Sequence, residues 1–151
     1  MGGKGLEGFI MGNEHILVVE DVLLVRNQLR ARLKETGYKV SVASKVSDAL
    51  HLVRTEMPDL VVLDLTLPEE DPFASLTDGF AFLRLLRSTY AQADAAVIIY
   101  SANRTPDVEA RAMSMGVSAV IEKKQGLTAL ITAIRSALDE RRPKDSVVTP
   151  E

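Results

Sequence analysis

Short runs of hydrophobic residues alternate along the chain with longer segments in which hydrophobic residues return every third or fourth position. A continuous apolar run of about four to eight residues is typical of a buried strand, whereas the wider spacing is typical of a helix with one buried face. The predicted strands are residues 15–19, 39–43, 60–63, 95–100 and 117–121.

Five helices are predicted between and after these strands. The first ends at Gly37, a residue suited to the left-handed turn that closes many helices. Pro58 stops the second helix, and Pro106 is well placed to open the fourth. The predicted helices are residues 22–36, residues 46–56, a segment from residue 79 onward, residues 106–116 and residues 127–142. The residues expected to face inward on the first two are Val22, Val25, Leu29, Leu33, Val46, Ala49, Leu50 and Val53.

Strands and helices that alternate in this way predict an α/β fold, because parallel strands need crossover connections, which are usually helices. Right-handed crossovers place helices on both faces of the sheet. We therefore expect a doubly wound, five-stranded parallel sheet with five helices. The central strand is expected at residues 60–63, because four consecutive apolar residues suit a strand that is covered on both faces.

One folded domain is expected at residues 14–142. Residues 1–13 are rich in glycine and lack periodicity, so they are interpreted as a disordered leader or a cloning remnant. They contain a formal G-x-G-x-x-G match, but it precedes the first strand, whereas a dinucleotide-binding fingerprint follows one. Residues 143–151 are expected to form a polar tail. The longest connection inside the domain is acidic and spans residues 68–78.

The composition argues against several classes of protein and several kinds of chemistry. Hydrophobic residues make up 46% of the chain and charged residues 26%, which is ordinary for a soluble globular protein. The formal net charge of -3 gives no general attraction to nucleic acid, so no direct contact with it is expected. The chain has no cysteine and therefore no disulfide or thiolate chemistry. No membrane span or signal peptide is recognisable, so we expect a cytoplasmic protein without a membrane contact.

Polar side chains follow four of the predicted strands. Glu20 and Asp21 come after the first strand, Asp64 after the third, Ser101 after the fourth and Lys123 after the fifth. In a parallel sheet these positions meet at the carboxyl edge, where open α/β sheets bind their ligands. Three carboxylates in one crevice repel one another unless a hard cation lies among them, and a site of oxygen ligands suits Mg²⁺. The sequence therefore predicts a magnesium site.

Ser101 and Lys123 add a hydroxyl group and an ammonium group to this acidic cluster. With a metal ion they could stabilise a phosphoryl group, whose transfer depends mainly on positioning and charge neutralisation. A carboxylate can be the nucleophile and form an aspartyl phosphate, and Asp64 is the candidate. Simpler roles stay open: Glu20 and Asp21 also suit the start of a helix, Asp64 could satisfy a turn, and Lys123 could be a solvated lysine.

These motifs resemble the receiver domain of bacterial two-component response regulators. The pair Glu20-Asp21 is similar to the acidic pair that follows the first strand of that family. Asp64 with Leu67-Pro68 resembles its phosphoacceptor, which is followed after two residues by an apolar residue and proline. Ser101-Ala102 resembles its Ser/Thr-Ala pair, and Lys123 its lysine at the end of the fifth strand. The resemblance covers residues 15 to about 142 and implies the flavodoxin-like receiver fold.

The resemblance implies a phosphoacceptor response regulator that receives a phosphoryl group from a sensor histidine kinase or a phosphotransfer protein. Such a domain is a signalling switch and not an enzyme, although it assists its own phosphorylation and dephosphorylation. It signals to a downstream protein target through the surface of its fourth helix, fifth strand and fifth helix, and the resemblance also allows a homodimer there. The implied site consists of the phosphoacceptor Asp64, the Mg²⁺ ligands Glu20, Asp21, Asp64 and the backbone carbonyl of Thr66, and the phosphate-contacting and switch residues Ser101, Ala102 and Lys123.

Three features depart from the family pattern. Val120 stands three residues before the lysine, where the family usually has Tyr or Phe, so the usual aromatic relay is not implied. Lys124 stands where a cis-proline often follows the lysine. Residues 69–77 lengthen the usual link, either as a loop for partner specificity or as a tolerated surface insertion.

Other hypotheses remain open. The chain could be a stand-alone switch, a receiver excised from a longer regulator with a DNA-binding or enzymatic output, or a receiver recognised without phosphorylation. A phosphohydrolase with an aspartyl nucleophile is less well supported, because its second Asp would occupy the position of Thr66. His15 and His51 have no second ligand at metal-binding spacing, so we expect structural or exposed roles for them.

Overall fold

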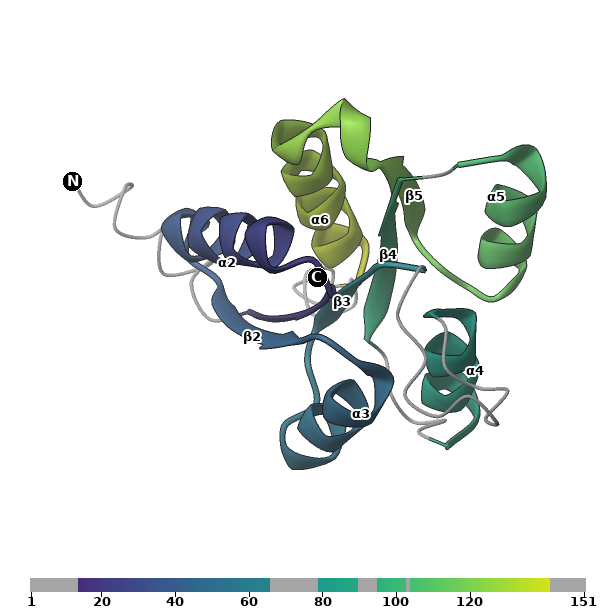
Figure 1. The fold of residues 1–151 in the computed structure, drawn as a ribbon, viewed down its shortest axis with the longest axis horizontal. Coiled ribbons are helices and arrows are strands. Elements are labelled where there is room, and N and C mark those ends of the chain that lie inside the picture. Colours follow the sequence, from purple (N-terminus) through teal and green to yellow (C-terminus); the bar gives the residue numbers. More distant parts are fainter. Residues whose placement is uncertain (1–13, 66–78, 90–94, 103, 142–151) are drawn as a thin grey trace, which may run out of the picture.

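The computed structural model describes residues 14–65, 79–89, 95–102 and 104–141. These residues form a parallel sheet of five strands in the order β2-β1-β3-β4-β5, with helices on both faces (Figure 1). The strands are β1 (His15–Val19), β2 (Lys39–Ala43), β3 (Leu60–Leu63), β4 (Ala96–Ser101) and β5 (Ala119–Glu122). The order is that of a flavodoxin-like, doubly wound sheet and confirms the predicted fold class.

Five α-helices follow the strands in the described part of the chain, as predicted. They are α2 (Leu23–Thr36), α3 (Val46–Thr55), α4 (Gly79–Thr89), α5 (Pro106–Ser114) and α6 (Leu127–Arg141). A short 3-10 helix, η1 (Lys123–Gln125), joins β5 to α6 and was not predicted. Helix α2 ends at Gly37, whose φ of 108° lies in the left-handed region expected from the sequence.

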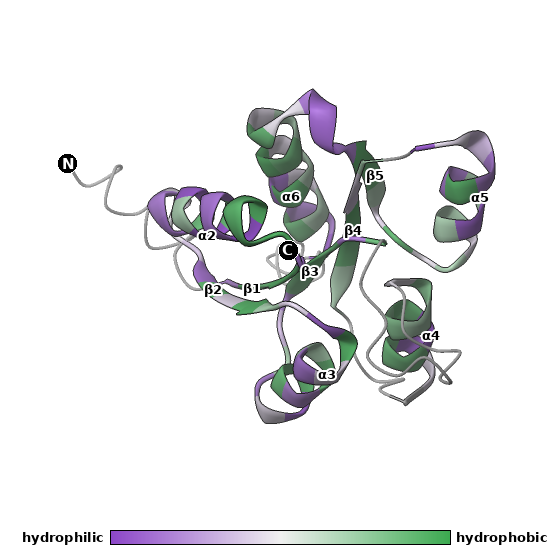
Figure 2. Ribbon diagram, in the orientation of Figure 1, coloured by the Kyte–Doolittle hydropathy of each residue, from purple (hydrophilic) through white to green (hydrophobic). Residues whose placement is uncertain are grey.

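Two hydrophobic cores lie on opposite faces of the sheet. Helices α3, α4 and α5 cover one face, and α2 and α6 cover the other (Figure 1). The central strand β3 contributes Val61 and Leu63 to the first core and Leu60 and Val62 to the second. Figure 2 shows hydrophobic residues along the inner strands and mixed surfaces on the surrounding helices. The unbroken apolar run in β3 is therefore explained by burial on both faces.

Several predicted bounds differ from the structure by one or two residues, among them the helix predicted at residues 106–116, which ends at Ser114. Val22 was expected to face inward on the first helix, but it is 46% exposed. Its backbone is extended (φ -79°, ψ 114°), so it precedes the helix and does not share the inward face of α2. The fifth strand begins at Ala119, two residues later than predicted, because the Val117 amide still donates to the carbonyl of Ala112 at the end of α5.

Helix α4 begins in close contact with the end of β3. The Gly79 amide donates to the Leu65 carbonyl at 3.1 Å. A Cβ atom at Gly79 would lie 2.6 Å from the Asp64 carbonyl oxygen and 2.6 Å from the Leu65 Cα. Glycine is required there by the close approach of two backbones. The predicted leader, acidic connection and tail lie outside the described residues and remain predictions.

Candidate functional site

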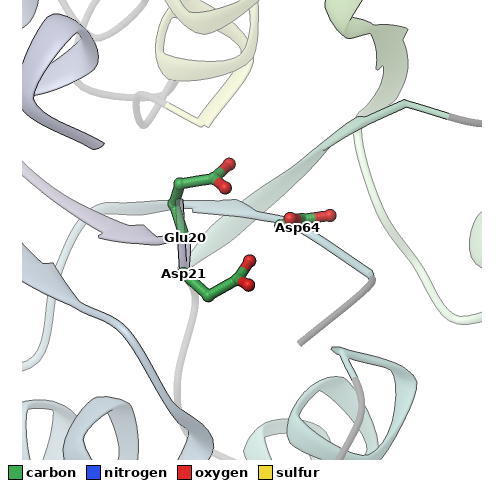
Figure 3. A group of neighbouring side chains, drawn as sticks. All are labelled: Glu20, Asp21 and Asp64. Carbon is green, nitrogen blue, oxygen red and sulfur yellow. The ribbon is translucent and has the colours of Figure 1, made fainter. Parts of the chain in front are cut away.

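The acidic residues that follow β1 and β3 lie together at the carboxyl edge of the sheet. The Asp64 amide donates to the Val19 carbonyl at 3.0 Å, and the Glu20 amide donates to the Ala43 carbonyl at 2.9 Å. These bonds continue the strand pairing beyond the ends of the strands and fix the backbone of both acidic residues. Carboxylate oxygens of Glu20, Asp21 and Asp64 all lie within 4.8 Å of one another (Figure 3).

Lys123 places its ammonium group between two of these carboxylates. Its Nζ lies 2.9 Å from Glu20 Oε1 and 3.3 Å from Asp64 Oδ2. Glu20 and Asp64 are only 1% and 4% exposed, whereas Asp21 is half-buried. Residues from the ends of β1 and β3 and from η1 therefore meet in one buried ionic cluster. This convergence of three distant chain segments is the one predicted from the strand ends.

The cluster carries more negative than positive charge. Burial raises the pKa of Glu20, and the nearby Asp64 adds to this effect, although the hydrogen bond from Lys123 opposes it. Burial acts to lower the pKa of Lys123, but its hydrogen bond to Glu20 and the charge of Asp64 outweigh burial and raise that pKa overall. Lys123 is therefore firmly charged, and it contacts two of the three carboxylates.

The donor set fits a hard divalent cation. Two ligands of one Mg²⁺ are separated by at most about 4.2 Å, since each Mg–O distance is about 2.1 Å. The carboxylate oxygens of Glu20, Asp21 and Asp64 all lie within 4.8 Å of one another, close to that value. The excess of negative charge supplies the electrostatic reason for binding a cation. Thr66, whose carbonyl is a further predicted ligand, lies outside the described residues.

Ser101 and Ala102 lie at the end of β4, next to the central strand. Ser101 is 2% exposed and is the register partner of Glu122, the residue immediately before Lys123. Ala102 is exposed. Both residues thus belong to the carboxyl edge that carries the acidic cluster.

Comparison with known proteins identifies the family. The response regulator receiver domain matches residues 16–135, which is most of the chain. The chain belongs to this family. As a receiver domain it has a phosphoacceptor role in two-component signalling.

Two of the relatives are response regulators. The response regulator MprA of Mycolicibacterium vanbaalenii is 32% identical over 130 residues, which cover 86% of this chain and 52% of that protein. MprA of Mycobacterium bovis is 30% identical over 131 residues, which cover 87% of this chain and 53% of that protein. The receiver domain described here thus spans about half the length of the curated relatives it matches.

Solved structures support the fold. The signal receiver domain of a putative Luxo repressor protein from Vibrio parahaemolyticus has a TM-score of 0.76 at 21% identity, covering 92% of this chain and 99% of that one. The non-phosphorylated HemR receiver domain from Leptospira biflexa has a TM-score of 0.75 at 27% identity, covering 86% and 98%. Within the described ranges, no helix of this receiver domain has the length and hydrophobicity needed to cross a membrane.

Two of the three departures from the family pattern lie in the described part of this receiver domain, whereas residues 69–77 lie outside it. Val120 is 5% exposed and packs in the core formed with α3, α4 and α5. The side chain of Lys124 is 81% exposed. His15 is buried and its Nε2 lies 2.8 Å from Ser41 Oγ, whereas His51 is exposed, so both histidines have the roles expected for them.

The polar contacts around η1 were not predicted from the sequence. Gln125 and Glu122 form a capping box in which each side chain bonds the backbone of the other residue. The usual signature of such a box has Ser, Thr, Asp or Asn at the first position, so Glu122 did not give that signal. Arg104, whose side chain reaches Gln125, carried no signal either, because its contact spans 21 positions.

Proposed function

We propose that Asp64 is the phosphoacceptor of this receiver domain. The observation that carries the proposal is the contact of Lys123 with both Glu20 and Asp64, at 2.9 and 3.3 Å, across 103 and 59 positions of sequence. The buried carboxylate can act as the nucleophile, and the ammonium group beside it can neutralise negative charge on the incoming phosphoryl group.

In the proposed reaction an Oδ of Asp64 attacks the phosphorus atom of a phosphohistidine on the donor protein. The new O–P bond forms as the P–N bond breaks, and the imidazole nitrogen leaves with its electron pair. Lys123 neutralises charge on the phosphoryl oxygens, and the Ser101 hydroxyl donates a hydrogen bond to one of them. Hydrolysis by water returns the carboxylate, so the domain takes part in both its phosphorylation and its dephosphorylation.

Glu20, Asp21 and Asp64, with the backbone carbonyl of Thr66, are the proposed ligands of Mg²⁺. The ion supplies charge neutralisation for the transferred phosphoryl group when it is bound. Glu20 also holds Lys123 by a hydrogen bond, so the residue has two roles at the site.

The proposed donor is a sensor histidine kinase or a phosphotransfer protein, and the proposed place of action is the cytoplasm. Support for a protein partner comes from Val22, Leu23 and Leu24, which are 46%, 60% and 67% exposed immediately after the acidic pair. Three consecutive exposed apolar residues beside a phosphorylation site suit a protein contact. The phosphorylated domain would then signal to a downstream protein, either as a separate switch or as part of a longer regulator.

Intact mass spectrometry with Mg²⁺ and acetyl phosphate tests the assignment of Asp64. The wild-type chain should gain one phosphoryl group, and the gain should disappear without Mg²⁺ and in Asp64→Asn. Asp48→Asn, which removes an exposed acid from α3, is the matched control and should be phosphorylated normally. A full mass gain in Asp64→Asn would show that another residue is the acceptor.

A further inference from the structure

One arginine connects two loops at the carboxyl edge of the sheet. Arg104 lies three residues after Ser101, between β4 and α5. Its Nε and Nη2 donate to the two carboxylate oxygens of Glu109 on α5, at 3.1 and 3.2 Å. Its Nη1 donates to Oε1 of Gln125 in η1 at 3.5 Å. A single guanidinium group thus contacts α5 and the turn that begins with Lys123.

Gln125 is itself held in place by short contacts. Its Oε1 accepts a hydrogen bond from the Glu122 amide at 2.8 Å, and the Glu122 side chain bonds the Gln125 backbone in return. This capping box fixes Gln125 relative to Lys123, which lies between the two residues. Glu122 is also the register partner of Ser101 across β4 and β5.

The pairing with Glu109 gives Arg104 a defined orientation. A guanidinium group that donates two parallel bonds to one carboxylate has less freedom than a lysine ammonium would have there. Glu109 also raises the pKa of Arg104, so the charge persists at all ordinary pH values. The backbone beyond Arg104 is held as well, because the Thr105 hydroxyl caps α5 by accepting from the Val108 amide at 3.2 Å.

We propose that Arg104 is a positioning residue for the phosphorylation site, which keeps the loop that follows Ser101 at a fixed place relative to Lys123 through Glu109 and Gln125. This inference rests on the proposed function of Asp64. Ser101 and Lys123 must reach oxygens of the same phosphoryl group, and a misplacement of about 1 Å can cost about a hundredfold in rate. Arg104 is exposed, and exposed ion pairs add little to stability. Its removal is therefore expected to change the rate more than the stability.

The kinetic test compares Arg104→Ala with Arg54→Ala, which removes an exposed arginine from α3. At saturating Mg²⁺, Arg104→Ala should be phosphorylated by acetyl phosphate about three- to tenfold more slowly than wild type, and Arg54→Ala at the wild-type rate. The Mg²⁺ concentration for half-maximal rate should not change, since the acidic residues are intact. Arg104→Lys should be nearly as slow as Arg104→Ala, because an ammonium group cannot form the paired contact.

A double-mutant cycle tests whether the effect passes through Ser101. In a Ser101→Ala background, Arg104→Ala should cause little further loss, because the hydroxyl group that it positions is absent. The same fold loss in both backgrounds would overturn the proposal, as would a wild-type rate in Arg104→Ala.

Amide hydrogen exchange tests the connection without any phosphoryl donor. Arg104→Ala should accelerate exchange both in the loop after β4 and in η1, whereas Arg54→Ala should leave both unchanged. Unchanged exchange in η1 would show that Arg104 does not hold the two loops together. Because this measurement needs no phosphorylation, it separates failure of the positioning role from failure of the proposed function.

Discussion

Lys123 is the residue on which the charge balance of the acidic cluster depends. Replacing it by glutamine removes this counter-charge from the buried carboxylates of Glu20 and Asp64. We expect the rate of phosphorylation at saturating Mg²⁺ to fall on the order of a hundredfold, the cost of losing one preorganised electrostatic contact to a transition state. The Mg²⁺ concentration for half-maximal rate should decrease, because a competing cation has been removed from the site.

Lys124 provides the matched control for this experiment. Its side chain is 81% exposed and lies next to Lys123 in sequence. Lys124→Gln should therefore retain the wild-type rate and Mg²⁺ dependence, measured by intact mass over time with acetyl phosphate. Equal losses in the two lysine variants would mean that overall charge, and not contact with the carboxylates, controls the reaction.

His15 makes stability depend on pH at the opposite edge of the sheet. Burial lowers its pKa, and Lys39 acts in the same direction, although Glu56 and Asp59 oppose the shift. His15 therefore binds a proton more readily in the unfolded chain, where its pKa is near 6.5, than in the folded chain. The contribution of neutral His15 is fully present above about pH 6.5 and is lost as the pH falls towards the lower folded pKa, with a slope of at most about 1.4 kcal/mol per pH unit.

Urea denaturation between pH 5 and 8 would measure this contribution. The wild-type chain should lose more stability below about pH 6.5 than His15→Gln, in which the titrating group is absent. His51→Gln, which replaces the exposed histidine, should follow the wild-type curve. Identical pH profiles for wild type and His15→Gln would contradict the prediction.

The set of candidate residues was predictable from sequence, but their contacts were not. Glu20, Asp64 and Lys123 each follow a buried strand, and parallel strands bring such positions to one edge. Which oxygen Lys123 contacts depends on side-chain length and rotamer, which the spacing does not contain. The contact of Arg104 with Gln125 was likewise unpredictable, because it depends on how two loops lie in space.

At the scale of elements, the junction of β3 and α4 is the most constrained. A Cβ at Gly79 would lie 2.6 Å from the Asp64 carbonyl oxygen, and backbone atoms cannot move aside as a flexible side chain can. Gly79→Ala should reduce the free energy of unfolding by about 1–3 kcal/mol, the usual cost of overpacking. It should also slow phosphorylation, because the start of α4 would displace the backbone of Asp64.

Gly37→Ala is the control for Gly79→Ala. Gly37 has a φ of 108°, and a Cβ atom added there would meet no other atom within 4 Å. Alanine at this position therefore costs only the left-handed backbone penalty, about 1–2 kcal/mol. The two variants should be destabilised similarly in urea denaturation, but only Gly79→Ala should lose phosphorylation rate. Slow phosphorylation in both would show that general destabilisation is responsible.

Element order was predictable because most strands are nearly unbroken apolar runs, whereas in the helices apolar residues return every third or fourth position. The ends of elements were less predictable. Val22 fits the helical spacing, yet it lies outside α2 because the backbone turns there from strand to helix. The turn η1 is only three residues long, too short for any period to identify it.

At the scale of the whole molecule, the acidic cluster should oppose folding when no cation is bound. Glu20, Asp21 and Asp64 lie close together, and Lys123 contacts Glu20 and Asp64. Burial strengthens the repulsion among the three carboxylates. Asp64→Asn removes one of these charges while its amide oxygen can still accept from Lys123. In EDTA we expect this variant to be more stable than wild type by about 1 kcal/mol.

Magnesium should reverse that order. A cation that binds only the folded state stabilises it by RT ln(1 + [L]/Kd), which is about 1.4 kcal/mol when the concentration is about ten times Kd. The wild-type chain has the full donor set and should gain this amount, whereas Asp64→Asn should gain less. Asp48→Asn, with an intact cluster, should gain as much stability from Mg²⁺ as the wild-type chain. Thermal denaturation in EDTA and in Mg²⁺ would measure the stability of all three chains. If the wild-type chain is already more stable than Asp64→Asn in EDTA, Lys123 alone suffices to balance the charge of the cluster.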